Sequence, residues 1–79
     1  MWTQGAIGIK DKNGKMVSVS YWVKHFDEES CFGINEGRIS KLMLKQGGKV
    51  VYNYDRGEDI EPQTPEAEKA LEILIYQFN

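Results

Sequence analysis

The stretch IGIKDKNGKMVSVSYWV, residues 7–23, decides the fold because it holds two alternating segments joined by a turn. Gly14 stands fourth in DKNGK, where a three-residue hairpin loop with a bulge needs a left-handed residue. That loop pairs Ile9 with Val17, whereas a two-residue type I′ turn would scatter the apolar side chains over both faces. The bulged register instead collects one apolar face, which consists of Ile7, Ile9, Val17, Val19, Tyr21 and Val23.

A second hairpin of the same form is indicated by KQGGK, residues 45–49. Gly again stands in the fourth position, and the apolar pattern again favours the bulged three-residue loop over a type I′ turn. With this loop, the core face of the second hairpin consists of Leu42, Leu44, Val50, Tyr52 and Tyr54.

The whole pattern predicts four strands, followed by one helix that covers the apolar face of their sheet. The expected strands form an antiparallel meander near residues 2–10, 16–26, 38–45 and 49–54. In the tail TPEAEKALEILIYQFN, Thr64 fits the N-cap and Pro65 the first helical position. Ile73 and Tyr76 lie off the apolar stripe, at its rim or at a dimer interface. The stripe itself consists of Ala67, Ala70, Leu71, Leu74, Ile75 and Phe78. The predicted fold is α+β, a single ββββα domain over residues 1–79.

Length and composition limit the function classes. The 79 residues build one small core, so dimerisation would be a source of extra stability. The single Cys31 forms no internal disulfide, and Met1 is not followed by a basic and then apolar leader. We therefore expect a cytoplasmic protein with no membrane segment. A net charge of −2 argues against a general polyanion binder, although the charges are unevenly distributed.

The second face of the predicted sheet carries Trp22, because side chains alternate along a strand. By the same alternation this open face holds Trp2, Gln4, Lys10, Met16, Ser18, Ser20, Lys24, Ile39, Lys41, Met43, Lys45, Lys49, Val51 and Asn53. No acidic residue is among them. The acids gather instead at residues 53–68, as Asp55, Glu58, Asp59, Glu61, Glu66 and Glu68.

Three interpretations of this open face remain. The first is an ordinary solvated polar face. The second is a nucleic-acid interface in which Trp22 stacks on bases and lysines contact phosphates, namely Lys10, Lys24, Lys41, Lys45 and Lys49. The third is an apolar patch for a protein partner or a second copy, formed by Trp2, Trp22, Met16, Met43, Ile39 and Val51. We expect a non-enzymatic interaction module of the third kind, with nucleic-acid binding as the alternative.

The residues that could carry chemistry lack a specific pattern. His25, Asp27, Cys31 and Asp55 do not have the ligand spacing of a zinc site, and the acidic cluster lacks that of an EF-hand. We expect no catalytic residue, metal, cofactor or small-molecule substrate. His25 is expected as a half-buried residue at a strand end. Cys31 and Phe32 are expected to anchor their loop, and Asp55 to pair locally with Arg56.

Several segments together resemble a group of short uncharacterised proteins from Firmicutes, their phages and mobile elements. The segments are MWTQG, SYWVKHFDE, GINEGRISKLMLKQGG, YNYDRG and ALEILIYQFN. The resemblance implies a bacterial or phage accessory protein with no assigned activity and no catalytic residues to carry over. Small proteins of that kind often bind a larger protein or nucleic acid.

Overall fold

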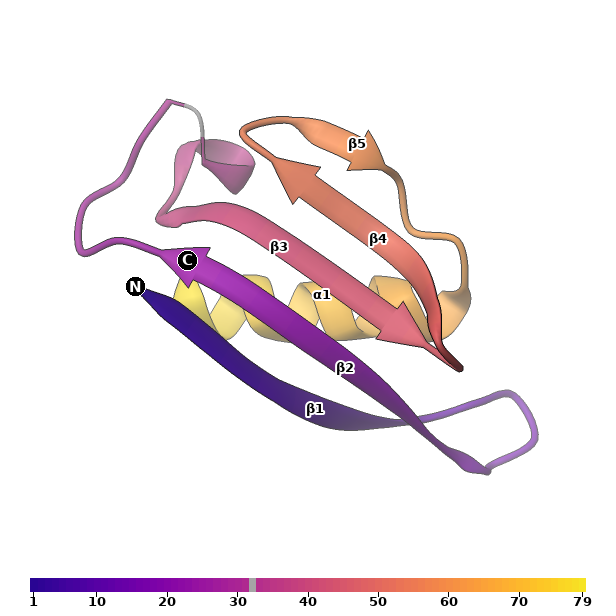
Figure 1. Cartoon of the computed structure of the whole chain (residues 1–79). Coiled ribbons are helices and arrows are strands. Elements are labelled where there is room, and N and C mark those ends of the chain that lie inside the picture. The colour runs from indigo at the N-terminus through magenta and orange to yellow at the C-terminus, as the bar shows by residue number, and fades with distance from the viewer. Residues whose placement is uncertain (32) are drawn as a thin grey trace.

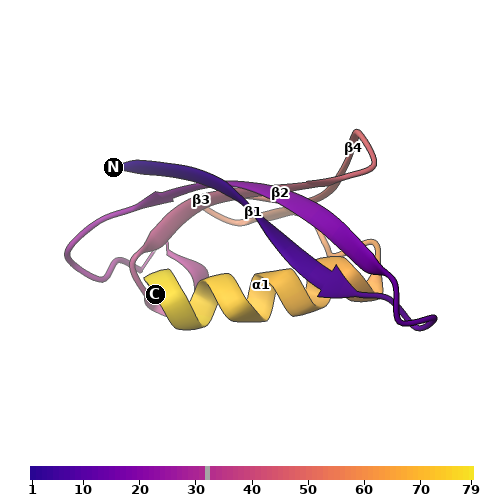
Figure 2. The same cartoon turned by 90° about the horizontal axis from the view of Figure 1, so that it is seen from below.

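The computed structural model describes residues 1–31 and 33–79 as an α+β fold, in which a five-stranded antiparallel sheet is covered on one face by a helix (Figures 1 and 2). The strands are neighbours in chain order, β1-β2-β3-β4-β5. The elements are β1 (Trp2–Lys10), β2 (Met16–His25), a 3-10 turn (Ile34–Glu36), β3 (Ile39–Gln46), β4 (Lys49–Asp55), β5 (Glu58–Ile60) and α1 (Pro65–Phe78).

The first hairpin has the predicted bulged loop. Ile9 pairs with Val17, and Gly14 adopts the left-handed conformation with φ of 80°. The carboxylate of Asp11 holds the loop by accepting N–H bonds from Asn13 at 2.8 Å and from Lys15 at 3.0 Å. The predicted apolar face of β1 and β2 therefore packs toward the helix, with Val19 and Val23 fully buried.

The second hairpin differs from the prediction. Gly47 and Gly48 form a two-residue turn with φ of 60° and 80°, as a type I′ turn requires. The register then shifts inside β4, because a bulge places Val51 beside Tyr52 on the core face. Val51 is 6% exposed and Val50 is 37% exposed, so placing Val50 in the core and Val51 on the open face was wrong.

A bulge between β2 and β3 overturns the predicted position of Ile39. Lys24 pairs with Lys41 but His25 pairs with Ile39, so Ser40 is an extra residue on β3. The backbone of Ser40 bonds outward instead, and its carbonyl accepts the N–H of Arg56 at 3.1 Å. Because the bulge reverses the alternation, Ile39 turns into the core and is fully buried. It is therefore no part of an open-face patch.

The segment between β4 and the helix forms a fifth strand, although only four strands were predicted. Arg56 adopts a left-handed conformation with φ of 60°, and the carbonyl of Gly57 accepts the N–H of Asp55 at 2.9 Å. This tight turn brings β5 back along β4, where Ile60 pairs with Asn53. The sheet therefore has five strands and the prediction of four was wrong, because a strand this short and acidic has little intrinsic β-propensity.

The helix begins and packs as predicted. Thr64 is its N-cap, with the hydroxyl accepting the N–H of Ala67 at 3.0 Å, and Pro65 follows. Ala67, Ala70 and Leu74 are fully buried against the sheet. The small alanines let the helix approach closely, so the core lies between α1 and the apolar sheet face. In the part of the chain that the structure describes, no helix has the length and apolar character to cross a membrane.

Candidate functional site

The open face of the sheet presents a continuous row of side chains across four strands. Gln4 of β1 pairs with Trp22 of β2, Trp22 with Met43 of β3, and Met43 with Asn53 of β4. Trp22 and Met43 are half-buried by their neighbours, whereas Trp2 at the start of β1 is 58% exposed. Two tryptophans and a methionine therefore lie on the face that the helix does not cover.

A cavity of about 230 Å³ opens beside this row. Its walls come from the first four strands and are mainly apolar, with one amide and one ion pair among them. Because Trp22, Met43 and Asn53 belong to the same cross-strand row, the cavity lies on the open face. The lining residues are Trp2, Trp22, Lys41, Leu42, Met43, Asn53, Tyr54 and Asp55.

Three of the predicted lysines lie around this cavity with their ammonium groups already engaged. The Nζ atom of Lys24 lies 6.0 Å from the ring centre of Trp2, and that of Lys45 lies 5.6 Å from the ring centre of Trp22. Such cation–π contacts hold the aliphatic stems along the rings. The third, Lys41, pairs with Asp55 at 3.5 Å. Lys41 thus lies in the wall of the cavity, and Lys24 and Lys45 form a rim beside its two tryptophans.

The open face also carries an acidic residue that the sequence interpretation missed. Strand β4 continues to Asp55, which is two residues after Asn53 and therefore faces the same side of the sheet. Its carboxylate pairs with Lys41 rather than with Arg56. The amide of Asn53 in turn donates to Asp59 at 3.0 Å. The open face, predicted to carry no acid, therefore has a carboxylate at β4 that offsets part of its positive charge. Extending the alternation by one residue past the expected strand end would have found Asp55.

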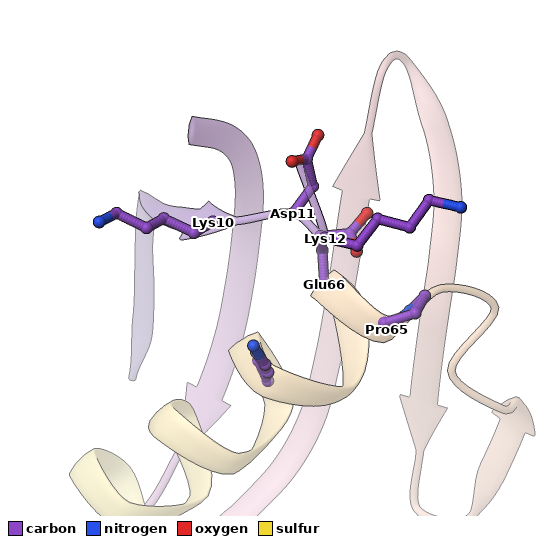
Figure 3. Close-up of a pocket in the computed structure, with 6 residues that line it drawn as sticks. Lys10, Asp11, Lys12, Pro65 and Glu66 are labelled. Atoms are coloured by element: carbon purple, nitrogen blue, oxygen red, sulfur yellow. The ribbon is translucent and has the colours of Figure 1, made fainter. Parts of the chain in front are cut away.

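The remaining predicted site residues lie farther along the sheet. Met16 is 63% exposed at the start of β2, and Lys49 begins β4. Lys10 ends β1 and lines a second cavity, of about 340 Å³, between the first hairpin loop and the start of α1. Figure 3 shows the side chains of Lys10 and Lys12 extending to opposite sides of this cavity. Its polar groups therefore do not converge on one point, as a ligand site requires.

The residues considered for chemistry are held in structural contacts or exposed. The Nε2 atom of His25 lies 3.1 Å from the hydroxyl of Thr3, and its ring lies 4.9 Å from that of Phe78, so it is the predicted half-buried residue. Cys31 is exposed, so its expected role as a loop anchor was wrong, and Phe32 lies outside the described residues. Among residues 1–31 and 33–79, no three His, Cys, Asp or Glu side chains come together to hold a metal ion.

One ionisable group in the core has a shifted pKa. Burial, together with the nearby charges of Glu58 and Tyr54, raises the pKa of the Tyr52 phenol to about 12. Tyr52 is 1% exposed and packs on the helix side of β4. This shift therefore reports the packing of the core rather than the chemistry of the open face.

These features define a small α+β protein with one sheet face covered by a helix and the other open, aromatic and rimmed by lysines. The chain belongs to the family described as Domain of unknown function (DUF7678), which matches residues 1–79. This match confirms the prediction that the chain belongs to an uncharacterised family. Comparison with the curated proteins and with the solved structures found no match.

Proposed function

We propose that this protein is a non-enzymatic interaction module that binds a protein partner through the cavity on its open sheet face. One observation carries the proposal: Trp2, Trp22 and Met43 converge on an apolar cavity of about 230 Å³ on the uncovered face. Tryptophan and methionine are enriched where proteins meet, and clustered aromatic residues carry most of the binding energy there.

The surroundings of the cavity define the chemistry of the partner. An apolar side chain would fit the cavity that Trp22 and Met43 help to line, and it would lie against the exposed ring of Trp2. The ammonium groups of Lys24 and Lys45 at the rim would then meet carboxylates. Complementary charge at a rim sets specificity and the rate of association. The expected partner segment therefore presents one apolar anchor with Asp or Glu on either side.

Nucleic acid is the alternative occupant of this face. A phosphate backbone on this face would approach Asp55, whose carboxylate lines the cavity and pairs with Lys41 at 3.5 Å. The net charge of −2 adds long-range repulsion of a polyanion. These contacts favour a protein partner.

The experiment selects random peptides displayed on phage against the folded protein and then measures binding by tryptophan fluorescence. We expect selected peptides to share an apolar residue flanked by Asp or Glu. Trp22→Ala should weaken their binding by at least about tenfold, as truncation of a central interface residue does. Met16→Ala is the matched control, because Met16 is exposed on the same face and does not line the cavity. Circular dichroism checks that both variants fold.

A selection that yields no peptide sensitive to Trp22→Ala would contradict the proposal. A titration with mixed-sequence DNA and RNA at about 50 mM salt gives the other decisive outcome. Binding tighter than roughly 10⁻⁴ M that weakens steeply with salt, and is lost in the Lys41→Glu, Lys45→Glu double variant, would overturn protein binding in favour of nucleic acid.

The proposal also includes the biological role and the cellular location of the protein. The resemblance to short bacterial and phage proteins supports an accessory protein that binds a larger protein. The single cysteine, Cys31, supports a reducing, cytoplasmic environment, since disulfides mark oxidising compartments.

A further inference from the structure

Strand β1 is one edge of the sheet (Figure 1). Half of its backbone groups therefore point away from β2. Met1 and His25 exchange hydrogen bonds, the amino group donating at 3.2 Å and the N–H of His25 at 3.0 Å. Such bonded pairs alternate along an antiparallel ladder, and the β1–β2 register has no shift. The odd-numbered residues of β1 therefore bond to β2. The outward N–H and C=O groups belong to Trp2, Gln4, Ala6, Gly8 and Lys10.

This edge lacks the features with which sheet edges usually prevent pairing. Proteins protect free edges with proline, bulges, charged side chains or very short strands. Strand β1 is nine residues long and regular, and its one charged residue is Lys10 at the end. The opposite edge, β5, is three residues long and begins with Glu58 and Asp59. Of the two edges, β1 is therefore the one open to another strand.

The glycines of β1 leave room for two side chains of β2 to lie against the strand. A Cβ atom at Gly5 would clash with the ring of Tyr21, and one at Gly8 would clash with the terminal methyl of Met16. Both side chains come from β2 and lie over β1, one on each face of the sheet. Both side chains lie above or below the strand, and the inward backbone groups bond to β2, which leaves the outward groups to pair with another strand.

We propose that a second copy of this chain pairs with β1, strand against strand and antiparallel, to form a two-fold symmetric dimer. An axis through Ala6 aligns the outward groups of both strands in one register. Trp2 then bonds to Lys10 of the second copy, Gln4 to Gly8, and Ala6 to its own counterpart. Every outward group of β1 finds a partner, which is the geometry of an antiparallel ladder.

The side chains suit this register as well as the backbone does. The small Ala6 lies at the axis, so nothing bulky or charged faces its own copy. Lys10 of the second copy comes beside the exposed ring of Trp2, a cation–π pairing that Lys24 already makes within the chain at 6.0 Å. On the helix side, Ile73 is 43% exposed and follows Glu66 and Lys69 at helical spacing. Those two residues line the cavity beside the first hairpin loop, which puts Ile73 on the β1 side of α1.

The symmetry explains why pairing would stop at two chains. An axis perpendicular to the sheet keeps both helices on one face and both open faces on the other. Continued growth would need the β5 edge, whose short acidic strand resists pairing. The dimer would extend a small core, and it would place two copies of the open-face cavity on one surface. Its interface shares Trp2 with that cavity, but Trp22 lies on the inner strand β2 and Ala6 does not line the cavity, so variants of Trp22 and Ala6 test the two proposals separately.

The test combines oligomeric state with amide exchange. Sedimentation equilibrium from about 1 µM to about 1 mM should show the mass rising from one chain to two. Hydrogen exchange followed by NMR should slow at least about tenfold with concentration at the outward amides of Gln4, Ala6 and Gly8. The amides of Gly5 and Ile7, which already bond to β2, should be protected at every concentration.

Two variants locate the interface. Ala6→Lys sets two like charges against each other at the axis and should raise the dissociation constant at least about tenfold. Ser18→Lys adds the same charge to the same face on the inner strand β2, at an exposed position, and should leave association within about threefold. Ala6→Pro is a second variant, because it removes an outward N–H that no bond within the chain uses.

A single-chain mass up to about 1 mM would overturn the proposal. So would a dimer whose outward β1 amides exchange at the same rate at high and low concentration, because association would then use another surface. Equal association of the Ala6→Lys and Ser18→Lys variants would also exclude the β1 edge. Loss of peptide binding in Trp22→Ala with unchanged dimerisation would separate this interface from the cavity.

Discussion

The side chain of Asn79 lies directly beside the Cα of Gly37, in the space that a Cβ atom there would fill. From this position its carbonyl oxygen accepts the N–H of Ile39 at 2.9 Å, and its amide donates to the carbonyl of Ile34 at 2.8 Å. The residue after the helix thus bonds to both sides of the turn that leads into β3. Glycine at position 37 is what makes this close approach possible.

Removing this amide should loosen the connection before β3. We expect Asn79→Ala to lower the free energy of unfolding by about 1–3 kcal/mol, because the part-buried N–H of Ile39 loses its partner. Gly37→Ala should cost a similar amount by displacing the same side chain. Denaturant titration measures both, and the double variant should lose less than the sum. Full additivity would mean that the two residues act independently.

The contact between helix and sheet should depend on Leu74, which is fully buried. We expect Leu74→Ala to lower the free energy of unfolding by about 2–5 kcal/mol. Tyr76→Ala is the control, since Tyr76 is 94% exposed on the same helix, and it should change stability by under about 0.5 kcal/mol. If Leu74→Ala unfolds the chain, Leu74→Met is the substitute variant. It should lower the free energy of unfolding by under about 1.5 kcal/mol, so the comparison with Tyr76→Ala can still be made. A loss below about 1 kcal/mol for Leu74→Ala would contradict this packing.

The two-residue turn between β3 and β4 should tolerate asparagine but not a β-branched residue. No atom lies within 4 Å of a Cβ built at Gly47, so substitutions there act through the backbone alone. Because asparagine tolerates a φ of 60°, Gly47→Asn should keep or raise stability by up to about 1 kcal/mol. Gly47→Val should cost about 1–3 kcal/mol. Thermal unfolding compares the two, and equal melting temperatures would exclude this turn.

Alkaline pH should destabilise the fold through Tyr52. Its native pKa of about 12 exceeds the value near 10 of the unfolded chain, so the unfolded state releases this proton first. The contribution is constant below about pH 10, and stability falls as pH rises from about 10 to about 12, by about 3 kcal/mol. Denaturant titration at about pH 9 and pH 11 measures the loss. Tyr52→Phe should lose less over this interval, and an equal loss would show that other groups cause it.

The first hairpin and the helix were predictable from sequence because their signals are local. Alternation at period two, together with Gly14 in its loop, determines a register that tertiary contacts only reinforce. Thr64, Pro65 and the spacing of the alanines and Leu74 likewise describe the helix and its buried side. The same alternation correctly placed Trp22 and Met43 on the open face, beside the cavity.

Only the tertiary structure decided where the alternation breaks. The bulges at Ser40 and Val51 turn Ile39 and Val51 into the core, and no local turn residue marks either one. A bulge gives up regular ladder pairing, and burial of an apolar side chain against α1 and its neighbours offsets that loss. Strand β5 also depends on the tertiary structure. Its acidic residues form a strand because the turn at Arg56 returns the chain to β4. The sequence by itself determined which elements form, because propensity and alternation act between near neighbours. The register of the last three strands, and with it the residues of the open face, depended on contacts between residues far apart in the chain.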